Sequence, residues 1–60
     1  MKGEKIMIKV EILYNQEHSR YEVWVWYGMY DSVRKGVFKT LKAARTRASK
    51  FGLEVDEHRI

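Results

Sequence analysis

Cysteine and proline are both absent from this chain of 60 residues, and only four glycines are present. The lack of cysteine excludes disulfides and thiolate metal sites, and it is compatible with a reducing compartment such as the cytoplasm. There is also no repeat, no low-complexity tract and no linker. We therefore expect one small domain over residues 1–60. A domain of this size buries only about 60% of the surface that its unfolded chain exposes, so its stability is marginal unless something supplements the core.

Long apolar runs are missing as well. The N-terminal segment MKGEKIMIKV alternates apolar and charged residues, which argues against a signal peptide or a membrane span and for a cytoplasmic protein. No Ser-His-acid arrangement, glycine-rich phosphate loop or paired-carboxylate motif is visible. His18 and His58 are 40 residues apart without neighbouring ligands. We expect no metal, no cofactor and no enzymatic activity.

The segment from Arg20 to Tyr30, RYEVWVWYGMY, is apolar on both faces of a strand. Its β-branched and aromatic residues fit a pleated sheet better than a helix, so it is predicted to be the central strand. One face would carry Tyr21, Val23, Val25, Tyr27 and Met29, and the other Trp24, Trp26 and Tyr30. A sheet needs only one apolar face, so the tryptophan face is available for nucleic acid, a second subunit or another part of the chain.

Residues 5–14, KIMIKVEILY, alternate in polarity and predict a half-buried strand that pairs with the central one. The polar segment Asn15 to Ser19 predicts the hairpin turn. If the numbers of facing residues sum to 35, Ile12 faces Val23 and Glu11 faces Trp24. A slip of one residue would set apolar side chains against charged ones along the whole ladder, so this parity is expected to hold.

The second half of the chain predicts a third strand over 33–39, with Gly36 as a bulge, followed by a helix over 41–51. Thr40 is the expected N-cap and Gly52 the stop, while Ala44 and Ala48 lie on the apolar helix face. A short last strand over 53–55 would follow, with residues 58–60 frayed. The predicted class is α+β, with a three- or four-stranded, mainly antiparallel sheet and one helix packed on one face.

Positive charge is concentrated in residues 31–52. This segment holds seven cations against the single acid Asp31, whereas the chain as a whole has a net charge of +4. Focused positive charge favours a polyanionic partner, although a charged helix face is often merely solvated. The candidate DNA-binding residues are Arg34, Lys35, Lys39, Lys42, Arg45, Arg47 and Lys50, together with Trp24 and Trp26 on the sheet.

From Tyr21 onward, the order strand, turn, strand, followed by GVFKTLKAA over residues 36–44, resembles the AP2-type domains and the arm-binding domains of some integrases. Those families carry a G-x-F-x-T-x-x-x-A stretch between the third strand and a packing helix. The resemblance covers residues 20–51. It implies DNA binding by the sheet face turned away from the helix, where Lys9, Trp24 and Trp26 would lie. The first-strand motif of those families is absent here.

The size, the basic charge and the lack of cysteine also resemble the small chromatin proteins of heat-loving archaea, which coat and bend DNA through a sheet. A Lys/Glu/Arg-rich chain with one Asn and one Gln is similar in composition to heat-adapted proteins. This second resemblance implies an archaeal, thermophilic source and a nucleoid-associated protein.

Our sequence-based hypothesis is sequence-tolerant binding of double-stranded DNA, with an architectural role in which a homodimer bends or bridges the duplex. Trp24 and Trp26 would either contact the DNA or form the dimer interface. Two alternatives remain open. The tryptophan face could dock a protein partner, or it could bind single-stranded nucleic acid by stacking.

Overall fold

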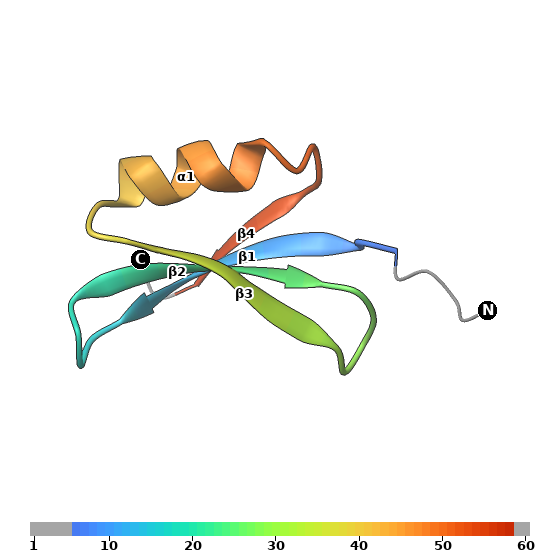
Figure 1. Cartoon of the computed structure of the whole chain (residues 1–60), viewed down its shortest axis with the longest axis horizontal. Coiled ribbons are helices and arrows are strands. Elements are labelled where there is room, and N and C mark those ends of the chain that lie inside the picture. The colour runs from blue at the N-terminus through green and yellow to red at the C-terminus, as the bar shows by residue number, and fades with distance from the viewer. Residues whose placement is uncertain (1–5, 59–60) are drawn as a thin grey trace.

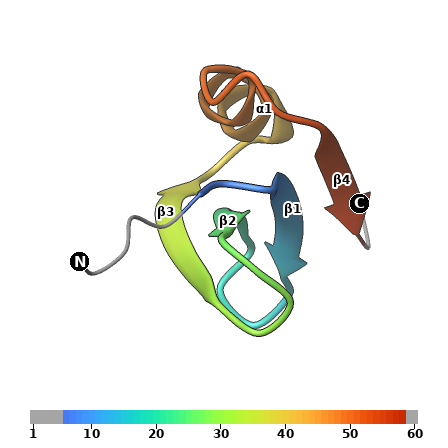
Figure 2. The same ribbon diagram turned by 90° about the vertical axis from the view of Figure 1, so that its right-hand side faces the viewer.

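The computed structural model describes residues 6–58, which form a four-stranded sheet with one helix against one face (Figures 1 and 2). The elements in chain order are β1 (Lys9–Asn15), β2 (Arg20–Trp26), β3 (Ser32–Phe38), α1 (Leu41–Ser49) and β4 (Val55–His58). The strand order across the sheet is β3-β2-β1-β4. Both β1 and β3 run antiparallel to β2, and β4 runs parallel to β1. The predicted α+β class is confirmed.

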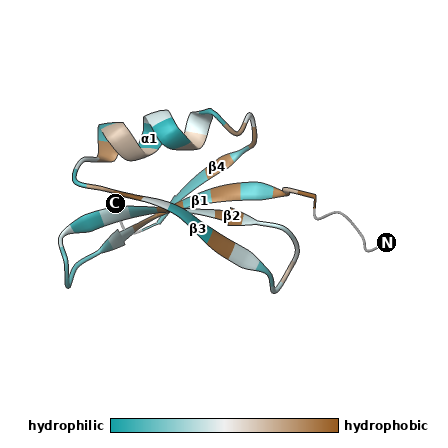
Figure 3. Cartoon of the chain, viewed as in Figure 1, coloured by the Kyte–Doolittle hydropathy of each residue, from teal (hydrophilic) through white to brown (hydrophobic). Residues whose placement is uncertain are grey.

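The register of the first hairpin has the parity that the alternation of polarity predicts. Ile12 pairs with Val23 and Glu11 pairs with Trp24, so the facing numbers sum to 35. Hydrophobic and hydrophilic bands alternate along β1 in Figure 3, and this alternation places one set of side chains under the helix. Strand β1 begins at Lys9, later than predicted, and Lys5 lies outside the described residues.

The core lies between α1 and the middle of the sheet. The fully buried side chains are Val10, Ile12, Val23, Val25, Ala44 and Ala48, each 0% exposed. Burying a Val or Ile side chain contributes about 1.5–3 kcal/mol each, so the four strand residues supply most of this stabilisation. The two alanines are small, which lets the helix backbone lie close to the sheet. Both were predicted to face it.

Strand β3 occupies Ser32–Phe38, one residue earlier than predicted, and it contains a bulge. Gly36, the predicted bulge residue, pairs with Val23, and the next pair is Arg34 with Trp24. The extra residue is therefore Lys35 and not Gly36. The bulge changes the parity of the strand, and it thereby moves Arg34 to the sheet face that α1 leaves uncovered.

The helix begins after Thr40, as predicted. The Thr40 backbone is extended, with a φ of −125°, and its Oγ1 accepts a hydrogen bond of 3.1 Å from the Ala43 N–H, which is the geometry of an N-cap. The helix ends at Ser49, two residues before the predicted end. Gly52, with a φ of 68°, donates its N–H to the Ser49 carbonyl, and a glycine takes this left-handed conformation at low cost.

The C-terminal segment differs most from its prediction. The last strand occupies Val55–His58 rather than 53–55, and it lies parallel to β1 at the edge of the sheet. The expectation that His58 is frayed is wrong, because His58 pairs with Leu13. Residues 59–60 lie outside the described part. The sequence VDEH is too polar to predict a strand by itself, and the strand forms because Val55 packs against the core and because β1 offers a free edge.

The central strand is shorter than predicted, since β2 ends at Trp26 instead of Tyr30. The Tyr27 N–H donates to the Asp31 carbonyl over 2.8 Å, and this bond closes the turn into β3. Met29 and Tyr30 are therefore 78% and 94% exposed, and neither contributes to the core.

Candidate nucleic-acid interface

The predicted binding residues lie on two opposite sides of the molecule. We call the sheet face turned away from α1 the open face. By the strand register it carries Lys9, Glu11, Arg20, Glu22, Trp24, Trp26, Arg34, Asp56 and His58. We call the exposed cations on and directly beside α1 that form no ion pair within residues 6–58 the helix surface, namely Lys39, Lys42, Arg47 and Lys50. The sheet and the helix lie between these two surfaces, so a single straight DNA duplex could contact only one of them at a time.

The two indoles of the open face are held by carboxylates. The Trp24 Nε1–H donates to Glu22 over 3.0 Å, and the Trp26 Nε1–H donates to Glu11 over 2.6 Å. Both tryptophans are half-buried. Each indole N–H already has an acceptor within the chain, and the neighbouring carboxylates would repel a phosphate.

Glu22 is the most constrained of these acids. Its carboxylate also accepts a hydrogen bond of 3.0 Å from the Asn15 side chain, and Arg34 lies 3.6 Å away. The hydrogen bond from Asn15, followed by that from Trp24, lowers the pKa of Glu22 below its ordinary value. The bulge in β3 is what brings Arg34 to this position, so these contacts tie together β1, β2 and β3.

The charges of the open face balance. The three cations are Lys9, Arg20 and Arg34, and the three acids are Glu11, Glu22 and Asp56. With a neutral His58, the open face has no net charge and thus no electrostatic preference for a polyanion.

The helix surface, in contrast, is uniformly positive. Lys39, Lys42, Arg47 and Lys50 are all exposed. Within residues 6–58, none of the four has a carboxylate oxygen within the 4.0 Å of an ion pair. Lys39 belongs to the short connection before α1, and Lys50 is the C-cap residue, so the four cations follow the helix from one end to the other.

Arg45 is also on α1, but it has an acidic partner. Its guanidinium donates two hydrogen bonds to Glu57 of β4, of 2.6 and 2.9 Å. The hydrogen bond raises the pKa of Arg45 and lowers that of Glu57. This bidentate pair links the helix to the last strand, and the charge of Arg45 is largely compensated.

The polar side chains between the cations point their hydroxyl protons at the helix itself. Thr46 donates to the Lys42 carbonyl over 3.0 Å, and Ser49 donates to the Thr46 carbonyl over 2.9 Å. These hydroxyls are therefore poor donors for base edges. Together with Ala43, they leave a surface of small side chains between flexible cations, which suits phosphates better than bases.

Two cations contact aromatic rings on the same side of the sheet as the helix. The Arg47 guanidinium lies 5.4 Å from the centre of the Phe51 ring, and the Lys35 Nζ lies 6.0 Å from that of Tyr27. Such contacts restrain the side chains without neutralising their charge. Arg47 thus remains available to an anion.

The carboxylate partners were missed by the sequence analysis. The predicted pairing already placed Glu11 opposite Trp24, so an acid beside the indoles could have been inferred. Asp56 and His58 gave no such signal, because their position on the open face depends on the parallel pairing of β4 with β1.

Comparison with protein families, with curated proteins and with solved structures finds no match for the chain. Across residues 6–58, no helix combines the length and the apolar character that crossing a membrane requires.

Proposed function

We propose that the chain binds double-stranded DNA through its phosphates, with little dependence on sequence, and that the helix surface makes the contact. The observation that carries this proposal is the row of exposed cations without acidic partners, Lys39, Lys42, Arg47 and Lys50. Cations of this kind release counterions from a duplex when they reach its backbone, which favours binding.

The balance of charge supports the helix surface over the open face. Phosphates brought to the open face would approach Glu11 and Glu22, which are fixed beside the indoles. Stacking of single-stranded bases on Trp24 and Trp26 would meet the same carboxylates. On the helix side, the Glu57 carboxylate is already bound by Arg45.

The role that follows is architectural. A small domain with one basic surface covers DNA, and two such domains joined back to back present two basic surfaces that bridge or bend a duplex. A nucleoid-associated protein would act in this way, in the cytoplasm and without a cofactor.

A salt titration on two unrelated duplexes of equal length tests the proposal. If all four cations reach phosphates, log K falls against log salt with a slope of about −3.6, which is about a hundredfold loss of affinity between 50 and 200 mM salt. Both duplexes should bind with similar affinity. Fluorescence anisotropy with labelled duplexes measures this directly.

Matched variants assign the surface. Lys42→Gln and Arg47→Gln should each flatten the slope by about 0.9 units. Lys9→Gln, which removes the same charge from the open face, should leave the slope unchanged. A slope that responds to Lys9→Gln alone would place the DNA on the open face, and a flat salt dependence of the unchanged chain would refute phosphate binding.

One observation favours a second function, that of a protein-interaction module. A hollow of about 520 Å³ at one end of the open face is lined by apolar and polar side chains, and Ile8 and Met29 beside it are 57% and 78% exposed. We call Ile8, Trp26 and Met29 the apolar end patch. A chain of this size gains stability by covering such a patch.

A further inference from the structure

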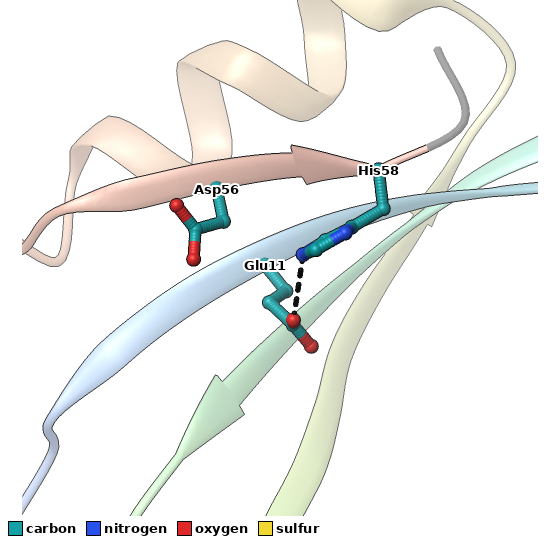
Figure 4. Close-up of side chains that lie close together, drawn as sticks. All are labelled: Glu11, Asp56 and His58. Atoms are coloured by element: carbon teal, nitrogen blue, oxygen red, sulfur yellow. Dashed lines mark ion pairs between the residues drawn. The ribbon is translucent and has the colours of Figure 1, made fainter.

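The edge of the sheet brings together three metal-ligating side chains that are far apart in the sequence. Glu11 lies on β1, and Asp56 and His58 lie on β4 (Figure 4). The parallel register pairs Glu11 with Asp56, and His58 follows two residues later on the same face of the strand. One ligand atom from each of the three lies within 4.8 Å of the others.

We infer that Glu11, Asp56 and His58 form a binding site for a divalent transition metal ion, of which Zn²⁺ fits the ligands best. One imidazole nitrogen and two carboxylate oxygens are ordinary zinc ligands, and imidazole favours zinc over Mg²⁺ or Ca²⁺. Three protein ligands at an exposed edge leave the fourth position to water. This inference is independent of the DNA-binding proposal, which concerns the opposite side of the molecule.

The geometry needs only small changes to accept the ion. Zinc bonds of about 2.0–2.2 Å put tetrahedral ligand atoms about 3.3–3.6 Å apart. The His58 Nε2 now lies 2.8 Å from the Glu11 Oε2, so these two atoms would move slightly apart to bind one ion. The ligand oxygen of Asp56, which lies within 4.8 Å of the other two ligand atoms, would move toward them. Its side chain is 42% exposed and that of His58 is 47% exposed, so both have room to rotate.

The carboxylates are already held by second partners, as metal-binding carboxylates are in known sites. The Trp26 indole donates to Oε1 of Glu11 over 2.6 Å, which leaves Oε2 to face His58. Lys9 donates to Oδ2 of Asp56 over 3.3 Å, and Oδ1 accepts no hydrogen bond within residues 6–58. The pairing of Trp26 with Glu11 thus orients one ligand and also gives the site a fluorescent reporter.

A bound ion would join the last strand to the middle of the sheet. The site would cross-link β1 and β4 on the open face, on the opposite side of β4 from the pair of Glu57 with Arg45. The C-terminal strand would then be fixed on both of its faces.

Calorimetric titration of the untagged, metal-depleted chain with ZnCl₂ tests the inference. We expect one ion per chain with a dissociation constant in the micromolar range, and quenching of Trp26 fluorescence when Co²⁺ replaces Zn²⁺. His58→Ala and Glu11→Gln should each weaken zinc binding about tenfold or more, and Trp26→Phe should weaken it about tenfold through the loss of its N–H. His18→Ala, which removes the other histidine, should change nothing.

Several outcomes would overturn the site. The first is that the unchanged chain binds no zinc. The second is that His58→Ala binds zinc as tightly as the unchanged chain does. The third is that His18→Ala loses zinc binding. If Mg²⁺ competed with Zn²⁺ for the chain at equal concentration, the cluster would merely attract cations through its carboxylates and would not be a zinc site.

Because a variant can fail to fold, NMR of the unchanged chain gives a separate measure. Zinc should shift the ring nitrogen signals of His58 and leave those of His18 in place.

Discussion

At the scale of single residues, the carboxylates of the open face determine how the tryptophans are used. Without Glu11 and Glu22, two adjacent indoles on an uncovered sheet would form a surface ready to stack with bases or with a partner. With them, each indole N–H is satisfied and each ring lies beside a negative charge. The tryptophans are consequently part of a polar network that joins three strands, and their abundance alone is a weak indicator of nucleic-acid binding.

Glu22 gives the first residue-level prediction. Its folded-state pKa is lowered, so the stability that it contributes is present above the unfolded-state pKa and is lost as the pH falls through the folded-state value. Glu22→Gln should reduce the free energy of unfolding near neutral pH by about 1 kcal/mol, the usual contribution of a hydrogen bond. It should also reduce the loss of stability on acidification below pH ~4.

Urea unfolding at neutral and acidic pH measures both effects. Glu17→Gln is the matched control, because Glu17 is exposed in the turn after β1. If the two variants show the same pH dependence, the network around Glu22 does not contribute to stability.

At the scale of secondary structure elements, β3 combines a bulge with a glycine that an aromatic ring covers. A Cβ added to Gly36 would meet the Phe38 ring at 2.7 and 2.8 Å. The ring thus fills the space that the missing side chain leaves, beside the buried Val23 with which Gly36 pairs.

Gly36→Ala is therefore expected to destabilise the fold by about 1–2 kcal/mol, since the ring of Phe38 must move from its packed position. In a Phe38→Leu background the clash is relieved, and the same change should be neutral or slightly stabilising because glycine is unfavourable in strands. Thermal or urea unfolding of the four proteins of this double-mutant cycle gives the coupling. If the effects of the two substitutions on the free energy of unfolding were additive, the packing of the Phe38 ring would not depend on Gly36.

The elements also differ in how far the sequence determined them. The parity of the β1–β2 hairpin was predicted correctly, because a one-residue slip would set apolar side chains against charged ones on both strands. Thr40 and the two alanines fixed the start and the inner face of α1. The position of Arg34 could not be predicted, since a one-residue bulge reverses the parity of β3. Strand β4 could not be predicted either, because its pairing depends on a free edge that exists only after the rest has folded.

The predicted binding residues show the same limit. Composition located the positive charge in the second half of the chain, and strand parity placed Trp24 and Trp26 on the sheet face away from the helix. Which of the cations have an acidic partner required the three-dimensional arrangement. The pairing of Arg45 with Glu57 is another long-range contact without a local signal.

At the scale of the whole molecule, the apolar end patch predicts self-association. Ile8 and Met29 stay largely exposed next to the half-buried Trp26, in a domain that has few other ways to increase its buried surface. A two-fold contact between copies would cover this patch and leave the helix surface of each chain free. A dimer would then carry two basic surfaces, as bridging of DNA requires.

Sedimentation velocity at micromolar concentrations should show a dimer for the unchanged chain and a monomer for Met29→Lys. Val37→Lys is the control, because Val37 is also an exposed apolar residue, 46% exposed, but lies on β3 away from the patch. If all three proteins were monomers, the apolar end patch would not be a dimer interface. Loss of the dimer in Val37→Lys alone would move the contact to the β3 edge.

The parallel attachment of β4 has a consequence for the order of folding. The β1–β2 hairpin closes a turn of a few residues, whereas the pairing of Val10 with Val55 closes a loop of roughly 45 residues, at an entropic cost of about 3 kcal/mol. The three antiparallel strands can therefore assemble from local contacts before the C-terminal strand joins them. As the last element to dock, β4 is also expected to be the first to detach, so its amide protons should exchange with solvent fastest among the strands. The fold thus has a nucleus in its three antiparallel strands and, in β4, an edge strand that detaches first.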